Sequence, residues 1–217
     1  MLSKLRKTIS FVANPSKLHG LGQLGSQGYL AQNGWFKSFK DKLPMDAAGK
    51  PLPWFTYPSI LFLNERLTKT MNVFEYGTGN STLYFASRVQ QIISVEHDQR
   101  WYDKYHPVLP NNVHSKFIEV DSIKVDYSQA AKNAGIRFDI LVIDGRKRKE
   151  CLMNSIDALS PGGIIILDDA ERTEYEMGIR YLFENYFRMI PFWGIAPGMV
   201  ELKCTAILYR KENCFNI

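Results

Sequence analysis

Short apolar runs alternate with segments of helical character from residue 58 onward. The runs at 73–76, 92–95, 116–120, 138–143 and 164–167 are short, largely apolar and bounded by turn or charged residues, which is typical of buried strands. Segments 60–67, 81–88, 99–106, 127–133, 147–159 and 173–185 predict the intervening helices. Two further strands, 187–193 and 204–210, follow with no helix between them.

This order of elements predicts an α/β fold. Strands joined by helices pair in parallel and place the helices on both faces of the sheet. The run 164–167, apolar at every position, fits a sheet that is buried on both faces. The last two strands can pair antiparallel, which puts one reversed strand near the edge. We therefore expect a Rossmann-like, doubly wound sheet of seven strands, mostly parallel, within a domain of residues 58–217.

Residues 1–57 differ from the rest of the chain. Glycines punctuate 20–34 and prolines punctuate 44–58, sustained periodicity is absent, and only 35–40 has the pattern of a short helix. We expect an irregular N-terminal arm with aromatic side chains to bury. Because the arm leads into the helix before the first strand, we expect it to form a lid over the ligand crevice, with Trp54 and Tyr57 closest to the substrate.

Composition narrows the functional classes. The 217 residues carry 27 Lys and Arg against 22 Asp and Glu, a net charge of +5, and 45% are hydrophobic, which fits one globular domain with an appendage. The positive charge is mostly spread out and no nucleic-acid-binding module is recognisable, so a small molecule is favoured over a nucleic acid as partner.

Cellular location is also constrained by the sequence. No apolar run approaches the ~18 residues of a membrane span, and the apolar part of the basic start is too short for a signal-peptide core. Cys151, Cys204 and Cys214 are far apart and form no CxxC motif, which argues against a disulfide framework or a zinc site. A reducing, cytoplasmic location is therefore expected.

Every predicted parallel strand ends in a carboxylate. These residues are Glu75, Glu96, Asp121, Asp144 and the pair Asp168 and Asp169. In doubly wound sheets the ligand lies beyond the carboxyl ends of the strands. The side chains therefore predict an acidic rim that favours a ligand with positive charge, although any one Asp could instead cap the helix that follows it.

The turn after the first strand reads Glu75-Tyr76-Gly77-Thr78-Gly79-Asn80-Ser81-Thr82. Its two glycines let a ligand approach the backbone closely. Thr82 stands where a dinucleotide fold needs Gly or Ala, and Glu75 would repel a pyrophosphate, so a nicotinamide cofactor is disfavoured. Glu96 lies 96 − 75 = 21 residues beyond Glu75, at the position from which a carboxylate grips ribose hydroxyls.

The string VFEYGTGNSTLYFA, followed by ISVEHD, IDG and SPGGIIILDDA, resembles class I S-adenosylmethionine-dependent methyltransferases, including bacterial members, over roughly residues 58–210. The resemblance implies that the glycine turn lies against the methionine part of S-adenosylmethionine, that a carboxylate holds its amino group, and that further carboxylates take its ribose and adenine. The residues concerned are Tyr76, Gly77, Thr78, Gly79 and Ser81 in the turn, Glu75 at the amino group, Glu96 with His97 at the ribose, Asp121 and Ser122 at the adenine, and Asp144 near the sulfonium.

Asp144, Asp168 and Asp169 end adjacent predicted strands and should lie close together. Three carboxylates suit Mg²⁺ or another divalent cation, and the arrangement resembles metal-dependent O-methyltransferases of the catechol type, except that Asp169 stands where those enzymes have Asn. The alternative is that Asp144 faces the cofactor and Asp169 caps the last helix. Asp144, Asp169 and His97 are also the candidate general bases, although His97 could instead only line the cofactor site.

Arg146 opens a run of four cations, residues 146–149, at the start of a predicted helix. Cations at this end oppose the helix dipole. The run therefore indicates an anionic substrate as an alternative to a solvated helix start, and Arg146 is a candidate substrate contact.

These features predict an enzyme that transfers a methyl group from S-adenosylmethionine to an acceptor, with an oxygen of a small molecule or sugar as the first choice. An aminopropyltransferase, which uses the decarboxylated cofactor on the same fold, remains open because of the acidic rim. The cations at 146–149 argue against its polycationic substrate. A non-catalytic cofactor-fold binding module is a further alternative, and the intact glycines and carboxylates count against it.

Overall fold

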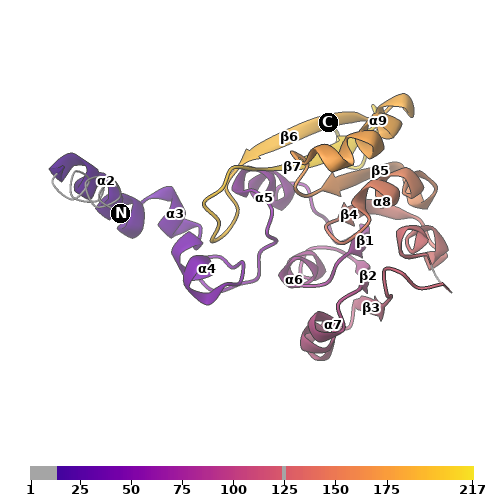
Figure 1. Ribbon diagram of the computed structural model, residues 1–217, viewed down its shortest axis with the longest axis horizontal. Coiled ribbons are helices and arrows are strands. Elements are labelled where there is room, and N and C mark those ends of the chain that lie inside the picture. The colour runs from indigo at the N-terminus through magenta and orange to yellow at the C-terminus, as the bar shows by residue number, and fades with distance from the viewer. Residues whose placement is uncertain (1–13, 124–125) are drawn as a thin grey trace.

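The computed structural model describes residues 14–123 and 126–217 and contains a seven-stranded sheet with helices on both faces (Figure 1). The strands are β1 (Asn72–Tyr76), β2 (Gln91–Glu96), β3 (Val113–Phe117), β4 (Phe138–Ile143), β5 (Leu159–Leu167), β6 (Arg188–Gly194) and β7 (Lys203–Tyr209). Their order is β3-β2-β1-β4-β5-β7-β6, with β1 to β5 parallel and β7 antiparallel to both of its neighbours. The predicted doubly wound sheet, with one reversed strand near its edge, is confirmed.

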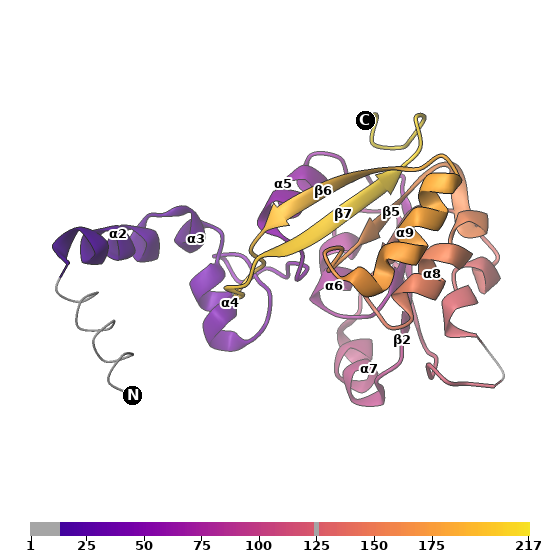
Figure 2. The same cartoon turned by 45° about the horizontal axis from the view of Figure 1, so that its top comes forward.

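Alternate residues of the central strands pack into two separate cores. Val73 of β1 and Ile140 of β4 belong to the core on one face, with α5 (Tyr57–Asn64) and α6 (Asn80–Ala86). Phe74 and Leu141 belong to the other core, with α8 (Arg148–Asn154) and α9 (Glu176–Glu184). Figure 2 shows the two helix layers on either side of the sheet. Because successive side chains of a strand point to opposite faces, both faces of these apolar strands are buried.

Three local predictions need correction. Strand β3 ends at Phe117, so Asp121 lies beyond the strand end and not directly at it. Segment 127–133 is not an α-helix but forms two single-turn 3₁₀ helices, η2 (Tyr127–Gln129) and η3 (Lys132–Ala134), and Gly135 in the left-handed conformation ends the second of them. Strand β5 begins at Leu159, five residues before the predicted start at 164, and Gly163 lets it approach β4: a Cβ there would lie 2.8 Å from the carbonyl oxygen of Phe138.

The remaining short helices complete the connections on the sheet. They are α7 (Gln99–Tyr105), η1 (His106–Val108), η4 (Ile156–Ala158) and η5 (Thr173–Tyr175). The predicted helix 147–159 is thus divided between α8 and η4, and 173–185 between η5 and α9. No described helix is long and apolar enough to cross a membrane.

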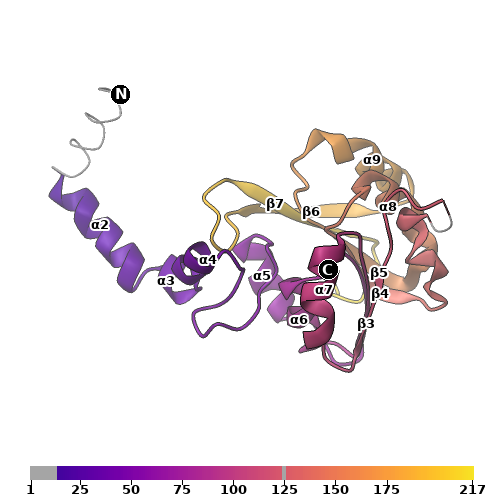
Figure 3. The same ribbon diagram turned by 60° about the horizontal axis from the view of Figure 1, so that its bottom comes forward.

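The described part of the arm is more regular than the sequence indicated. It contains α2 (Pro15–Ser26), α3 (Tyr29–Gln32) and α4 (Trp35–Asp41), of which only α4 was predicted. Helix α2 forms despite its glycines because Pro15 occupies the first turn and the Asn14 side chain accepts a hydrogen bond from the Lys17 amide at 3.2 Å. None of its residues is buried, and Figures 1 to 3 show it projecting away from the sheet.

The second half of the arm is fastened to the loop and strands of the β6–β7 hairpin. Phe55 is fully buried against the sheet core. Long-range hydrogen bonds join the arm to the hairpin: Trp35 Nε1 to the Met199 carbonyl (2.6 Å), Trp54 Nε1 to the Pro197 carbonyl (3.1 Å) and the Thr56 amide to Thr205 Oγ1 (3.0 Å). These contacts hold the arm beside the carboxyl ends of the parallel strands.

Candidate functional site

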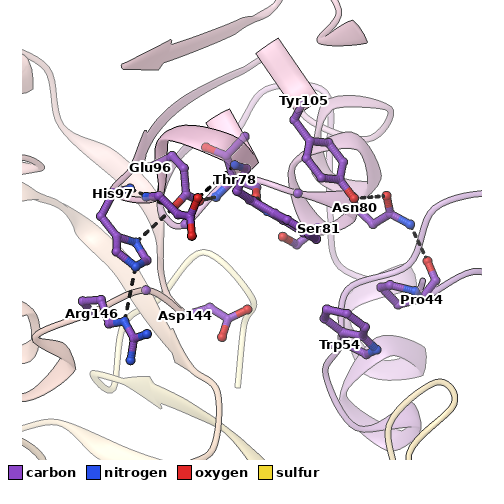
Figure 4. Close-up of a pocket in the computed structure, with 15 residues that line it drawn as sticks. Pro44, Trp54, Thr78, Asn80, Ser81, Glu96, His97, Tyr105, Asp144 and Arg146 are labelled. Carbon is purple, nitrogen blue, oxygen red and sulfur yellow. Dashed lines mark hydrogen bonds and ion pairs between the residues drawn. The ribbon is translucent and has the colours of Figure 1, made fainter. Parts of the chain in front are cut away.

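A cavity of about 330 Å³ lies at the carboxyl ends of β1, β2 and β4. The loops after these strands form one wall, and Pro44 and Trp54 of the arm form the opposite wall (Figure 4). The sequence-predicted residues in the lining are Trp54, Gly77, Thr78, Gly79, Ser81, Glu96, His97, Asp144 and Arg146. The cavity therefore lies where ligands of doubly wound sheets are expected, beyond the carboxyl ends of the strands. The arm contributes to its wall.

The turn after β1 is held from behind by Glu75. This side chain is fully buried and outside the lining, so the geometry does not support the expected contact with a ligand amino group. The hydroxyls of Ser81 and Thr82 donate to its two carboxylate oxygens, and Thr82 Oγ1 accepts a hydrogen bond from the Gly79 amide at 2.9 Å. Burial raises the pKa of Glu75 to about 8, against the lowering effect of the two hydroxyls. Glu75 is therefore a support for the loop.

The two positions in this turn require glycine for different reasons. Gly77 has φ of 111°, a conformation that residues with a Cβ rarely adopt. A Cβ on Gly79 would lie 3.4 Å from Nε1 of Trp101, whose indole donates a hydrogen bond to the Thr78 carbonyl. The backbone of the turn thus faces the cavity with no side chain in the way at these two positions.

Glu96 ends β2 inside the lining and is only 3% exposed. Its Oε1 accepts hydrogen bonds from the amides of His97 (2.7 Å) and Asp98 (2.8 Å), and Oε2 accepts one from the Thr78 amide (2.9 Å). Since a carboxylate has about four acceptor sites, Oε2 keeps capacity for a ligand hydroxyl. The carboxylate is fixed in place by the backbone before any ligand arrives.

His97 connects Glu96 to Arg146. His97 Nδ1 lies 2.9 Å from Glu96 Oε1, and Arg146 Nε donates to His97 Nε2 at 3.2 Å (Figure 4). Because Nε2 accepts from the guanidinium, the proton of the neutral ring belongs on Nδ1, which lies near Glu96 Oε1 without making a hydrogen bond to a described residue. This arrangement makes His97 a lining and positioning group, with its second nitrogen already engaged.

Several lining residues were not identified from the sequence. Tyr105 donates from its hydroxyl to Asn80 Oδ1 (3.0 Å), and Asn80 Nδ2 donates to the Pro44 carbonyl (2.7 Å), so α7, α6 and the arm are joined at the cavity rim. Trp101 of α7 also lines the cavity. No sequence motif signals Pro44, because its place depends on the path of the arm.

Asp144, Asp168 and Asp169 do lie close together, but cationic side chains occupy the space among them. Lys203 Nζ lies 3.0 Å from Asp168 Oδ2 and 2.7 Å from Asp169 Oδ1. Arg148 reaches Asp144 at 2.9 Å and Asp169 at 3.4 Å. Within the described residues, no three His, Cys, Asp or Glu side chains are arranged to hold a metal ion. The expected metal site is therefore corrected to an ion-pair network, and these residues do not fit Mg²⁺.

The network gives its carboxyls different proton affinities. Burial and the charge of Asp168 raise the pKa of Asp144 to about 7, with Arg148 opposing them. Burial also raises the pKa of Asp168. Burial acts in the same direction on Asp169, but the hydrogen bond and charge of Lys203 outweigh it and hold that pKa below its ordinary value. Of the three, Asp144 alone lines the cavity, so it is the best placed to exchange a proton near neutral pH.

Four other predicted contacts lie outside the lining. Tyr57 is buried and donates to the Asn33 carbonyl at 3.2 Å, and Tyr76 is buried and donates to the Ser128 carbonyl at 2.8 Å. The Asp121 side chain is 95% exposed and lies 3.6 Å from Lys147 Nζ. Ser122 follows it in the same loop beyond β3. None of these residues borders the cavity as it stands.

Comparison with known proteins identifies the fold. No known family model matches the chain, and no curated protein is similar to it in sequence. Among solved structures, the O-methyltransferase of Bacillus cereus in complex with S-adenosylhomocysteine matches 88% of this chain and 97% of its own, with a TM-score of 0.58 and 17% identity. The Geobacter metallireducens precorrin-6y C5,15-methyltransferase matches 79% and 97% (TM-score 0.54, 12% identity). Precorrin-8w decarboxylase from Methanobacterium thermoautotrophicum matches 78% and 97% (TM-score 0.52, 21% identity).

Proposed function

We propose that this chain, which has the class I S-adenosylmethionine-dependent methyltransferase fold, binds S-adenosylmethionine in the 330 Å³ cavity. It would transfer the methyl group to an oxygen of a small molecule or sugar. The observation that carries the proposal is the pairing of the open Gly77–Gly79 turn with the fixed carboxylate of Glu96 in one cavity. The bound S-adenosylhomocysteine of the Bacillus cereus enzyme supports the same ligand class.

Asp144 is the proposed general base. S-adenosylmethionine supplies a methyl group on a cationic sulfur, and methyl transfer requires that the acceptor oxygen be aligned with it and lose its proton. A carboxyl with a pKa of about 7 at the cavity surface can take that proton at neutral pH. Arg148 Nη2, 2.9 Å from Asp144 Oδ1, would hold the carboxylate in orientation. Trp54 and Pro44 would exclude water from the opposite side.

The test is a set of calorimetric titrations with S-adenosylmethionine, its decarboxylated form and NAD. We expect the first to bind best, whereas preference for the decarboxylated form would indicate an aminopropyltransferase. Glu96→Gln keeps the side-chain shape but loses a charged acceptor, and should weaken S-adenosylmethionine binding by ~1–3 kcal/mol. Glu119→Gln, at an exposed position beyond β3, is the matched control. Undiminished affinity in a folded Glu96→Gln variant would refute the ribose assignment.

A further inference from the structure

A second cavity adjoins the first on the far side of Arg146. It measures about 310 Å³ and is formed by the start of α8 together with Arg172, Glu174 and Tyr175. Gly145 and Arg146 line both cavities. A ligand seated in the second cavity could therefore extend past Arg146 toward Asp144 in the first.

Cationic side chains dominate this second cavity. Its lining holds five Lys and Arg residues and two Glu residues. Four of the five cations have a carboxylate within 4 Å: Lys147 with Asp121, Arg148 with Asp144, Lys149 with Glu150, and Arg172 with Asp169. Within the described part of the chain, Arg146 has no such carboxylate partner. One positive charge between the two cavities is therefore left without a counter-charge.

Arg146 is nonetheless held in place. Its Nε donates to His97 Nε2 at 3.2 Å, and the backbone amide of His97 donates to Glu96 Oε1 at 2.7 Å. The two Nη groups make no hydrogen bond with another described side chain, and Figure 4 shows them directed away from His97. A guanidinium fixed at one nitrogen and open at the others is prepared for two-pronged recognition of an oxyanion.

We infer that the second cavity binds a phosphate group of the methyl acceptor, with Arg146 as its main ligand and Lys149 and Arg172 beside it. Phosphate fits better than a carboxylate because, after two of its oxygens have met the Arg146 fork, it has further oxygens for Lys149 and Arg172, which line the same cavity. The acceptor would then be a phosphorylated small molecule whose nucleophilic oxygen reaches Asp144. That the phosphate belongs to a methyl acceptor rests on the proposed function. The binding of an anion at Arg146 does not.

The test is a ³¹P NMR titration with inorganic phosphate at constant ionic strength, with and without saturating S-adenosylhomocysteine. We expect wild-type protein and the Lys132→Gln control, which loses a charge at an exposed site elsewhere, to bind phosphate equally. Arg146→Gln should bind it at least about tenfold more weakly, and Arg146→Lys should fall between them. Acetate, added as a competing carboxylate and followed through the phosphate signal, should displace phosphate from the wild type only at higher concentration.

Three outcomes would overturn the inference. Arg146→Gln could bind phosphate as the wild type does, or acetate could bind as well as phosphate. Alternatively, Arg146→Gln could lose affinity for S-adenosylhomocysteine while its phosphate binding is unchanged, which would assign Arg146 to the cofactor carboxylate. Phosphate binding at Arg146 in a protein that does not bind S-adenosylhomocysteine would instead retain the anion site and remove the proposed methyl transfer.

Discussion

Replacing Glu75 with Gln should change how the stability of the protein depends on pH. The folded protein holds this carboxyl at a pKa of about 8, against an ordinary value of 4.5, mainly because it is buried. Below pH 4.5 the group is protonated in both states, and above that pH only the folded state keeps the proton. The folded state is therefore progressively destabilised as the pH rises from 4.5 to 8. A shift of about 3.5 units corresponds to roughly 5 kcal/mol over the full window.

The assay is urea unfolding at a series of pH values from 5 to 8, followed by far-ultraviolet circular dichroism. Over this range wild-type protein should lose about 3.5 kcal/mol more stability than Glu75→Gln, because the neutral amide has no proton to lose. Gln can still accept from one of the Ser81 and Thr82 hydroxyls and donate to the other. Glu65→Gln, whose side chain is 77% exposed, should keep the wild-type profile. Parallel profiles for wild type and Glu75→Gln would refute the buried, proton-holding role.

Further predictions concern the ion-pair network and the metal. Lys203→Met should lower the free energy of unfolding by about 3–5 kcal/mol, because it leaves the buried Asp168 and Asp169 without their ammonium partner. Lys211→Met, at an exposed position, is the control in the same urea assay, and equal effects of the two would contradict the network. Lys203 and Arg148 already neutralise the carboxylates of Asp144, Asp168 and Asp169. Added Mg²⁺ should therefore not raise the melting temperature, and a chelator should not lower the affinity for S-adenosylmethionine. An affinity that falls with chelator would restore the metal-site hypothesis.

The sheet could be predicted from the sequence because its signal is local. Apolar runs such as 164–167 and the turns that follow them determine strand and connection together, and the strand-end carboxylates Glu96 and Asp144 follow directly from that order. Glu75 shows the limit of this reasoning. Its position at the strand end was predicted, but whether the side chain faces the cavity or lies behind the loop depends on the hydroxyls of the next helix turn.

The other misses depend on residues that are distant in sequence. The spacing of Asp144, Asp168 and Asp169 suggested a metal, whereas Lys203, 35 positions beyond Asp168, reaches Asp168 and Asp169 from β7. Tyr57 was expected near the substrate because of its position in the chain, yet its ring is buried in the core beneath the arm. Contacts between residues close in sequence can be predicted from the local pattern. A contact with a side chain from a distant strand cannot.

The hydrogen bonds between the arm and the hairpin affect the order in which parts of the protein can fold during synthesis. Thr56 and Thr205 are 149 positions apart, and Trp54 and Pro197 are 143 apart. At synthesis rates of about 5–20 residues per second, residue 56 is added to the chain roughly 7–30 s before its partner. The wall formed by Trp54 is therefore completed only after the C-terminal hairpin emerges. Until then the nascent chain exposes aromatic residues of the arm to chaperones and to neighbouring chains.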